Sequence, residues 1–162
     1  MKNRLSALLL LVFLLAAAFS LAAAEEPAVL PETEVSAVLE DGVYIAAFGT
    51  DSSMFHVNEA WEGKAVLTVE NGAMTLHLVM PSKNILQLFA GLAADAGAEG
   101  AVPIDPTVEE VTYKDGFKEN VFAFDIPVPV IGEEFDCALI GKKGKWYDHK
   151  VIVTDPVPYT AG

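Results

Sequence analysis

The Asn71-Gly72 pair constrains the fold of this chain more than any other local feature, because two strand-like runs meet at it. Residues 64–69 and 73–80 have the apolar patterning of strands, and Asn-Gly accepts the positive φ angles of a type I′ turn. The two runs are therefore predicted to form a β-hairpin. Its second strand is expected to have one core face, formed by Met74, Leu76, Leu78 and Met80.

Similar signals recur on either side of this hairpin. A further strand is predicted at 43–48, and a second hairpin at 108–126 turns at Asp115-Gly116. A third hairpin is predicted to join 135–140 to 145–153 across the glycine- and lysine-rich residues between them. Seven short strands with turn signals between them favour an all-β immunoglobulin-like antiparallel β-sandwich over residues 41–155.

Three other segments modify this picture. The apolar residues of 85–92 recur at helical spacing, which predicts one short helix covering part of the sheet. Pro127 and Pro129 are expected to end strand pairing, because proline has no N–H to donate. Residues 156–162 are predicted to be a C-terminal tail.

The N-terminus has the layout of a secretory signal peptide. Lys2 and Arg4 precede an apolar stretch at 7–21, and the small residues 22–24 precede Glu25. A membrane anchor is the alternative, but the stretch is short for a span of about 20 residues and no charged cluster follows it. Residues 1–24 are therefore predicted to be cleaved and 25–40 to be a flexible arm. The mature protein is expected to be secreted, periplasmic or associated with the cell surface, without an integral membrane anchor.

Charge and cysteine content exclude several classes of partner and scaffold. The chain carries 23 acidic residues and a net charge of −13, which becomes −15 once Lys2 and Arg4 leave with the signal peptide. This charge argues against nucleic acid as a partner. The single cysteine, Cys137, cannot form an intramolecular disulfide and lies in an apolar run, so it is predicted to be a buried thiol. No nucleophile, metalloprotease, phosphate-loop or dinucleotide motif is present, and we do not expect an enzyme.

The segment 141–151 reverses the charge of the chain locally. Four lysines gather in these eleven residues, around Tyr147. Nearby cations favour a phenolate, and tyrosine is a known axial ligand of haem iron, so Tyr147 is a candidate iron ligand. Lys145 and Lys150 are candidate sources of peripheral charge. The alternative is a solvated hairpin tip with an aromatic residue packed beneath it.

This segment resembles the last strands of the near-iron-transporter (NEAT) domain, a secreted immunoglobulin-like module that binds haem. The family strand carries Tyr-x-His-x-Tyr or a close variant, and its first tyrosine ligates haem iron. Tyr147 and His149 match the first two positions, whereas the second tyrosine of the pattern is Val151 here. The resemblance implies haem as the cofactor and Tyr147 as its ligand.

The family also has a short helix near its first hairpin that bears a serine and often a methionine and closes over the porphyrin. Residues 51–55 lie at the corresponding point, and Asp51 or Ser52 is suited to cap a single helical turn. The resemblance therefore implies that Ser53 and Met54 contact the ligand, and that Met54 and Phe55 supply an apolar wall.

Two functions follow as hypotheses. The first is a secreted module that binds haem or iron for nutrient uptake. The second is an extracellular interaction or adhesion scaffold without a small ligand, whose partner is an envelope or extracellular protein. A transition-metal site made by His56, His149 and Asp148 is a further alternative, although isolated histidines are more often structural.

Overall fold

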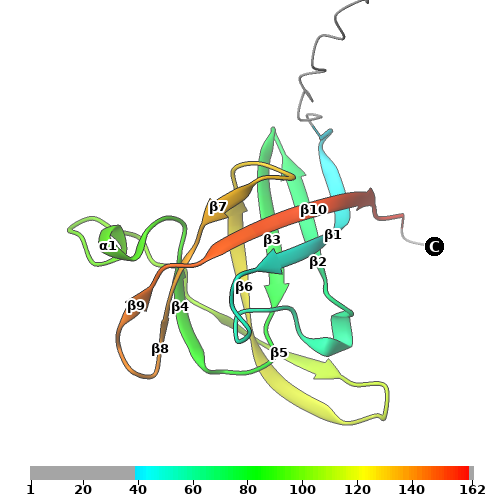
Figure 1. The fold of residues 1–162 in the computed structure, drawn as a ribbon. Helices are drawn as coiled ribbons and strands as arrows, with labels where there is room; N and C mark the ends of the chain where they lie inside the picture. Colours follow the sequence, from blue (N-terminus) through cyan, green and yellow to red (C-terminus); the bar gives the residue numbers. More distant parts are fainter. Residues whose placement is uncertain (1–38, 161–162) are drawn as a thin grey trace, which may run out of the picture. The chain divides into compact units, whose positions relative to one another are not determined.

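The structure is a computed structural model, and it describes residues 39–160 (Figure 1). The predicted signal peptide and almost all of the predicted arm lie outside the described residues, so both stay predictions.

Most of the strands form one antiparallel sheet. Its order is β5-β6-β3-β2-β1-β10-β7, so the first and last long strands, β1 and β10, lie side by side near one edge. The strand bounds are β1 (Gly42–Thr50), β2 (Lys64–Glu70), β3 (Ala73–Val79), β5 (Thr107–Thr112), β6 (Lys118–Val128), β7 (Glu134–Asp136) and β10 (Lys150–Pro158).

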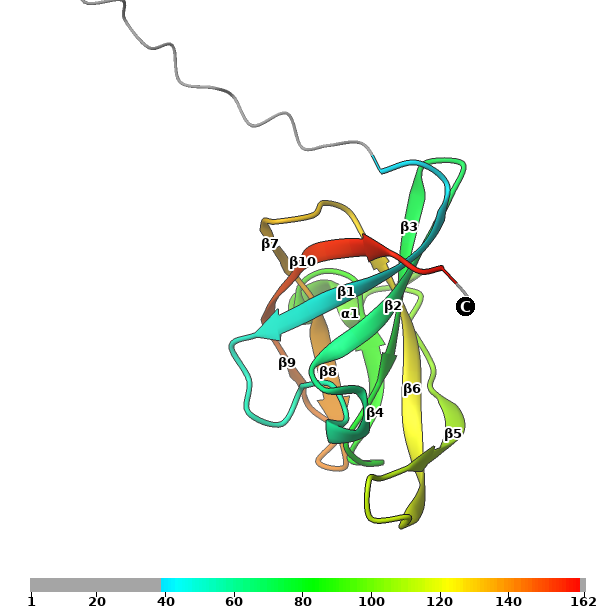
Figure 2. The ribbon, with the colours of Figure 1, turned by 90° about the vertical axis from the view of Figure 1, so that its right-hand side faces the viewer.

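A second, smaller sheet has the order β4-β8-β9, with bounds β4 (Ile85–Phe89), β8 (Ala138–Gly141) and β9 (Trp146–Tyr147). Figure 1 shows these three strands grouped at one side of the molecule, with the short helix α1 (Ala93–Ala96) beyond them. Figure 2 shows the same grouping from a second direction. A 3-10 helix, η1 (Glu59–Trp61), precedes β2. The predicted fold class, an immunoglobulin-like antiparallel β-sandwich, is confirmed, with ten strands among the described residues where seven were expected.

The predicted hairpin at Asn71-Gly72 is formed by β2 and β3. Asn71 and Gly72 have φ angles of 52° and 76°, as a type I′ turn requires. The Asp41 carboxylate accepts hydrogen bonds from both of their backbone N–H groups, at 2.9 and 3.2 Å. The second predicted hairpin is also confirmed, as β5 and β6.

The predicted helix at 85–92 is wrong, because its first five residues form β4. The pairing of β4 with β8 shifts register between Ile85 and Gln87, which is the signature of a bulge. A bulge adds one residue to a strand, so Ile85 and Leu88 are both buried although they stand three positions apart. This three-residue spacing imitates a helix in the sequence.

The third predicted hairpin is divided between the two sheets. β7 pairs with β10 in the large sheet, whereas β8 pairs with β9 in the small one. Both chain segments therefore pass from one sheet to the other, at Cys137 and at 148–149. Two strand ends were also predicted wrongly. Pro127 lies inside β6 opposite Thr75, and β10 continues to Pro158 into the predicted tail.

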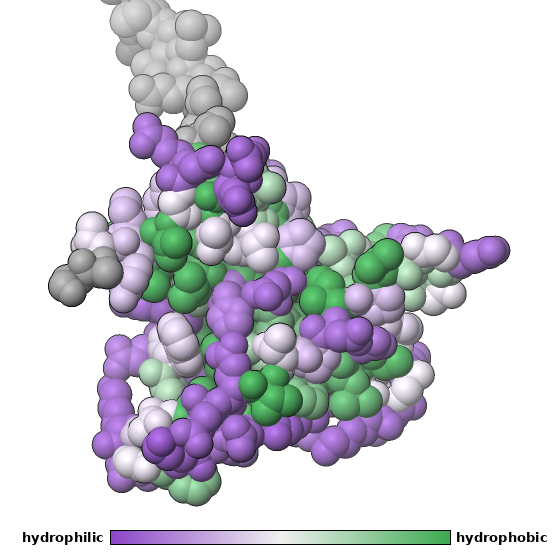
Figure 3. Space-filling model, turned by 180° about the vertical axis from the view of Figure 1, so that it is seen from behind, coloured by the Kyte–Doolittle hydropathy of each residue, from purple (hydrophilic) through white to green (hydrophobic). Residues whose placement is uncertain are grey.

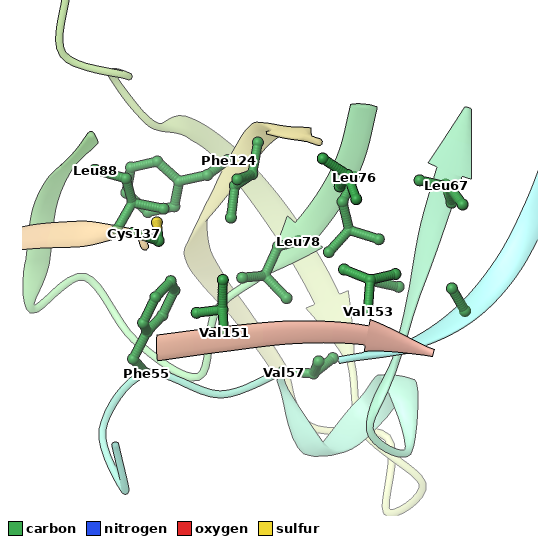
Figure 4. Packing of buried hydrophobic residues seen from close by; sticks show 14 of the residues in the cluster. Phe55, Val57, Leu67, Leu76, Leu78, Leu88, Phe124, Cys137, Val151 and Val153 are labelled. Carbon is green, nitrogen blue, oxygen red and sulfur yellow. The ribbon is translucent and has the colours of Figure 1, made fainter. Parts of the chain in front are cut away.

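The core lies between the two sheets. In Figure 4 the side chains of Leu78 and Val151 point into a shared interior that Phe55 and Leu88 also enter. Leu76 and Leu78 are fully buried, which confirms the predicted face of β3. Cys137 is buried as well, and burial raises the pKa of its thiol to about 12, so the predicted buried thiol is confirmed.

The surface seen from behind is mixed in polarity (Figure 3). On the face shown in Figure 3, hydrophobic patches (green) are interrupted by hydrophilic residues (purple). Among residues 39–160, no helix has the length and apolar character needed to cross a membrane.

Candidate functional site

A cleft of about 820 Å³ opens where three segments meet. These segments are the loop after β1, the link between β3 and β4, and the hairpin of β8 and β9. The cleft is lined by Asp51, Ser52, Ser53, Met54, His56, Pro81, Ser82, Asn84, Ile85, Leu139, Gly141, Lys142, Lys143, Tyr147 and His149.

The loop after β1 is shaped by hydroxyl groups rather than by a helix. The Ser52 N–H donates to Thr50 Oγ1 at 3.2 Å, and the Met54 N–H donates to Ser52 Oγ at 3.4 Å. Such side-chain hydrogen bonds offer the backbone an alternative to helical pairing. The predicted helical turn at 51–55 is therefore wrong, and the loop follows an irregular path along the cleft.

Two neighbouring residues of this loop have opposite environments. Met54 is 69% exposed and lines the cleft together with Ser53. Phe55 is fully buried, with its ring centroid 5.4 Å from that of Phe48 and 6.3 Å from that of His149. The expectation that Phe55 forms part of the ligand wall is therefore corrected, since Phe55 belongs to the core.

Tyr147 reaches the cleft from the small sheet. It pairs with Leu139 across β8 and β9, and it is 42% exposed. The Nζ atom of Lys145 lies 5.1 Å from the centroid of the Tyr147 ring. The structure thus brings Ser53, Met54 and Tyr147 to one cleft, with Lys145 next to the tyrosine.

His149 and Asp51 form the closest polar contact of the cleft. His149 Nδ1 lies 2.8 Å from Asp51 Oδ1. This hydrogen bond is the main cause that lowers the pKa of the Asp51 carboxyl, and a backbone N–H of Lys150 adds to it. Because an ionised carboxylate only accepts hydrogen bonds, His149 Nδ1 carries a proton.

The predicted lysines do not line the cleft, and two that were not predicted do. Lys150 pairs with Asp136 at 2.7 Å on the large sheet and is not among the lining residues. Lys142 and Lys143 line the cleft from the turn between β8 and β9. The Gly141-Lys142-Lys143-Gly144 sequence was a signal for them, because a turn exposes its two central side chains.

The metal-site alternative is not formed. His56 Nε2 lies 3.6 Å from Glu59 Oε1. Asp148 Oδ1 accepts a hydrogen bond from the Ala93 N–H. In the part of the chain that the structure describes, no group of three or more His, Cys, Asp or Glu side chains is placed to hold a metal ion.

Comparison with known proteins gives little further information. No protein-family model matches the chain, and the search of curated proteins gives no match. A search of solved structures matches a mutant of IsdX2-NEAT5 in complex with heme, at 19% sequence identity and a TM-score of 0.46. The match covers 75% of this chain and 100% of that chain. It is a domain of the family that residues 147–151 resemble, but a TM-score below 0.5 assigns neither fold nor function, and the sandwich is assigned from its strand pairing.

Proposed function

We propose that this protein is an exported binding module that holds haem in the cleft, with the Tyr147 oxygen as the iron ligand. The observation that carries the proposal is the position of Tyr147, an exposed tyrosine in the wall of an 820 Å³ cleft.

The size and lining of the cleft suit this ligand. Small-molecule sites commonly measure about 300–1,000 Å³ and have mostly apolar walls with a few polar groups. Met54, Pro81, Ile85 and Leu139 supply apolar surface for a porphyrin. Tyr147 supplies a hard oxygen donor of the kind that ligates ferric haem.

The departure from the NEAT pattern is explained by packing. Val151 is fully buried in the core and is not among the residues that line the cleft, so this position does not present its side chain to the ligand. Lys145 is the cation next to the proposed ligand, with its Nζ atom 5.1 Å from the centroid of the Tyr147 ring.

The biological setting that we propose follows from the N-terminal sequence. An exported haem-binding module would serve nutrient uptake and would meet an envelope or extracellular protein. We propose a binding role and not catalysis.

Haem titration followed by visible absorption tests the proposal. Wild type is expected to give a phenolate-to-iron charge-transfer band that Tyr147→Phe lacks, because the mutation keeps the ring and removes only the oxygen. Tyr159→Phe is the matched control, since Tyr159 is also exposed and does not line the cleft. Circular dichroism checks that all three proteins are folded. Absence of haem binding by wild type, or equal spectra for wild type and Tyr147→Phe, overturns the proposal and favours the interaction scaffold.

A further inference from the structure

The lysines at the cleft form no ion pair with a carboxylate of the described residues. Three described lysines form ion pairs with carboxylates elsewhere: Lys114 with Glu62, Lys118 with Glu110, and Lys150 with Asp136. Within residues 39–160, Lys142, Lys143 and Lys145 form none, although the chain has 23 acidic residues. Lys64 and Lys83 are also without an ion pair, but neither lines the cleft. The cleft therefore has cations at its edge that the protein itself does not neutralise.

The turn that carries Lys142 and Lys143 is well defined. The Gly144 N–H donates to the Gly141 carbonyl at 2.9 Å, and Gly144 has a φ angle of 68°. A Cβ at Gly141 would approach the Asn84 carbonyl to 3.2 Å, so the turn packs closely against the link between β3 and β4. Both lysines occupy the central positions of this turn and are exposed. The backbone of both lysines is thus anchored beside the cleft.

Two carboxylates at or next to cleft-lining positions already accept hydrogen bonds from other groups of the protein. Asp51 accepts its hydrogen bond from His149, and Asp148 accepts one from the Ala93 N–H. In a protein with a net charge of −13, two such unneutralised cations next to a mostly apolar cleft favour an anionic ligand.

We infer that Lys142 and Lys143 select ligands that carry carboxylate groups at the edge of their apolar body. This inference rests on the proposed function and narrows it, since it names acidic porphyrins as the ligand class and assigns the carboxylate site to residues other than Tyr147. Haem has two propionate groups on one edge. With the macrocycle in the cleft, these two groups would meet Lys142 and Lys143, and Tyr147 would bind the iron.

The test uses metal-free protoporphyrin and its dimethyl ester, which differ only in the two carboxylates. Neither contains iron, so ligation by Tyr147 does not contribute to the result. Binding is followed by porphyrin fluorescence, and the two compounds are added from separate stocks in the same detergent. Exposed ion pairs are individually weak, so wild type is expected to bind the diacid about 2- to 30-fold more tightly than the diester. High salt is expected to reduce this preference.

The variant that tests the assignment is Lys142→Gln/Lys143→Gln, which is expected to bind both compounds with nearly equal affinity. Lys114→Gln/Lys118→Gln is the matched control, because it changes the net charge equally on the β5–β6 hairpin, outside the cleft. The control is expected to keep the wild-type preference.

Any of three results overturns the inference: wild type binds the diacid and the diester equally, wild type binds neither compound, or the Lys142→Gln/Lys143→Gln variant retains the preference. A preference lost equally in Lys114→Gln/Lys118→Gln also overturns it, because the effect then comes from net charge. Failure of the haem titration with a preserved diacid preference contradicts only the role of Tyr147.

Discussion

Asp51 and His149, 98 positions apart in the sequence, are joined by a 2.8 Å contact between Oδ1 and Nδ1. The contact ties the loop after β1 to the link between β9 and β10, and the Asp51 N–H also donates to the Lys150 carbonyl at 3.2 Å. The first segment carries Met54 and the second follows Tyr147. The pair therefore fixes the two sides of the cleft relative to each other.

Asp51→Asn is expected to lower stability in a way that depends on pH. The folded protein lowers the pKa of Asp51 from 3.8, so its contribution is present above that value and is lost as pH falls through the folded-state pKa. Urea unfolding should show wild type more stable than Asp51→Asn at pH 6, with the difference shrinking below pH 3.8. Asp95→Asn is the control, because the Asp95 side chain forms no hydrogen bond or ion pair within residues 39–160. A difference that is the same at pH 6 and pH 3 would contradict the prediction.

Leu78→Ala is expected to cost about 2–5 kcal/mol of unfolding free energy, because it removes a fully buried side chain from the centre of the sandwich. Val108→Ala is the control on the same sheet. Val108 is 58% exposed, so its change should stay within about 0.5 kcal/mol. Chemical unfolding measures both. A cost below about 1 kcal/mol for Leu78→Ala would place β3 in the wrong register.

Gly72→Ala is expected to destabilise the β2–β3 hairpin by about 1 kcal/mol or more, because a Cβ is strained at a φ angle of 76°. Space is not the cause, since nothing lies within 4 Å of the added Cβ. Gly97→Ala separates the two effects, because it is equally open but has a φ angle of −97°. Equal unfolding midpoints for the two variants would argue against a type I′ turn at Asn71-Gly72.

Local sequence signals predicted the parts of the fold that depend on neighbouring residues. The Asn71-Gly72 turn and the alternation of Leu76 and Leu78 depend only on local φ angles and on a period of two, so both were visible in the sequence. The bulge in β4 was not visible, because its pairing with β8 decides where the extra residue lies. Its result, Ile85 and Leu88 on one side, has the spacing of a helix.

The site was predictable in part for the same reason. The cluster of lysines around Tyr147 indicated the hairpin that borders the cleft. The alternation of side chains along a strand did not predict which of these lysines reach the cleft. Lys150 lies after the point where the chain enters the large sheet, and there it meets Asp136. Lys142 and Lys143 remain on the turn at the cleft. This division between sheets is a long-range property that local spacing does not encode.

Truncation of Phe55 is expected to lower the stability of the fold, whereas truncation of Met54 is expected to lower haem affinity, although the two residues are adjacent and both apolar. Phe55→Ala opens a cavity beside Phe48 and is expected to cost about 3–5 kcal/mol of unfolding free energy. Met54→Ala removes a side chain that is 69% exposed, so its unfolding free energy should change by less than about 0.5 kcal/mol. Haem affinity is expected to fall roughly three- to tenfold in Met54→Ala, because the ligand loses an apolar contact. Urea unfolding and haem titration of the two variants measure these effects. A destabilised Met54→Ala, or unchanged haem affinity in a folded Met54→Ala, would show that Met54 does not act as the apolar wall of the cleft.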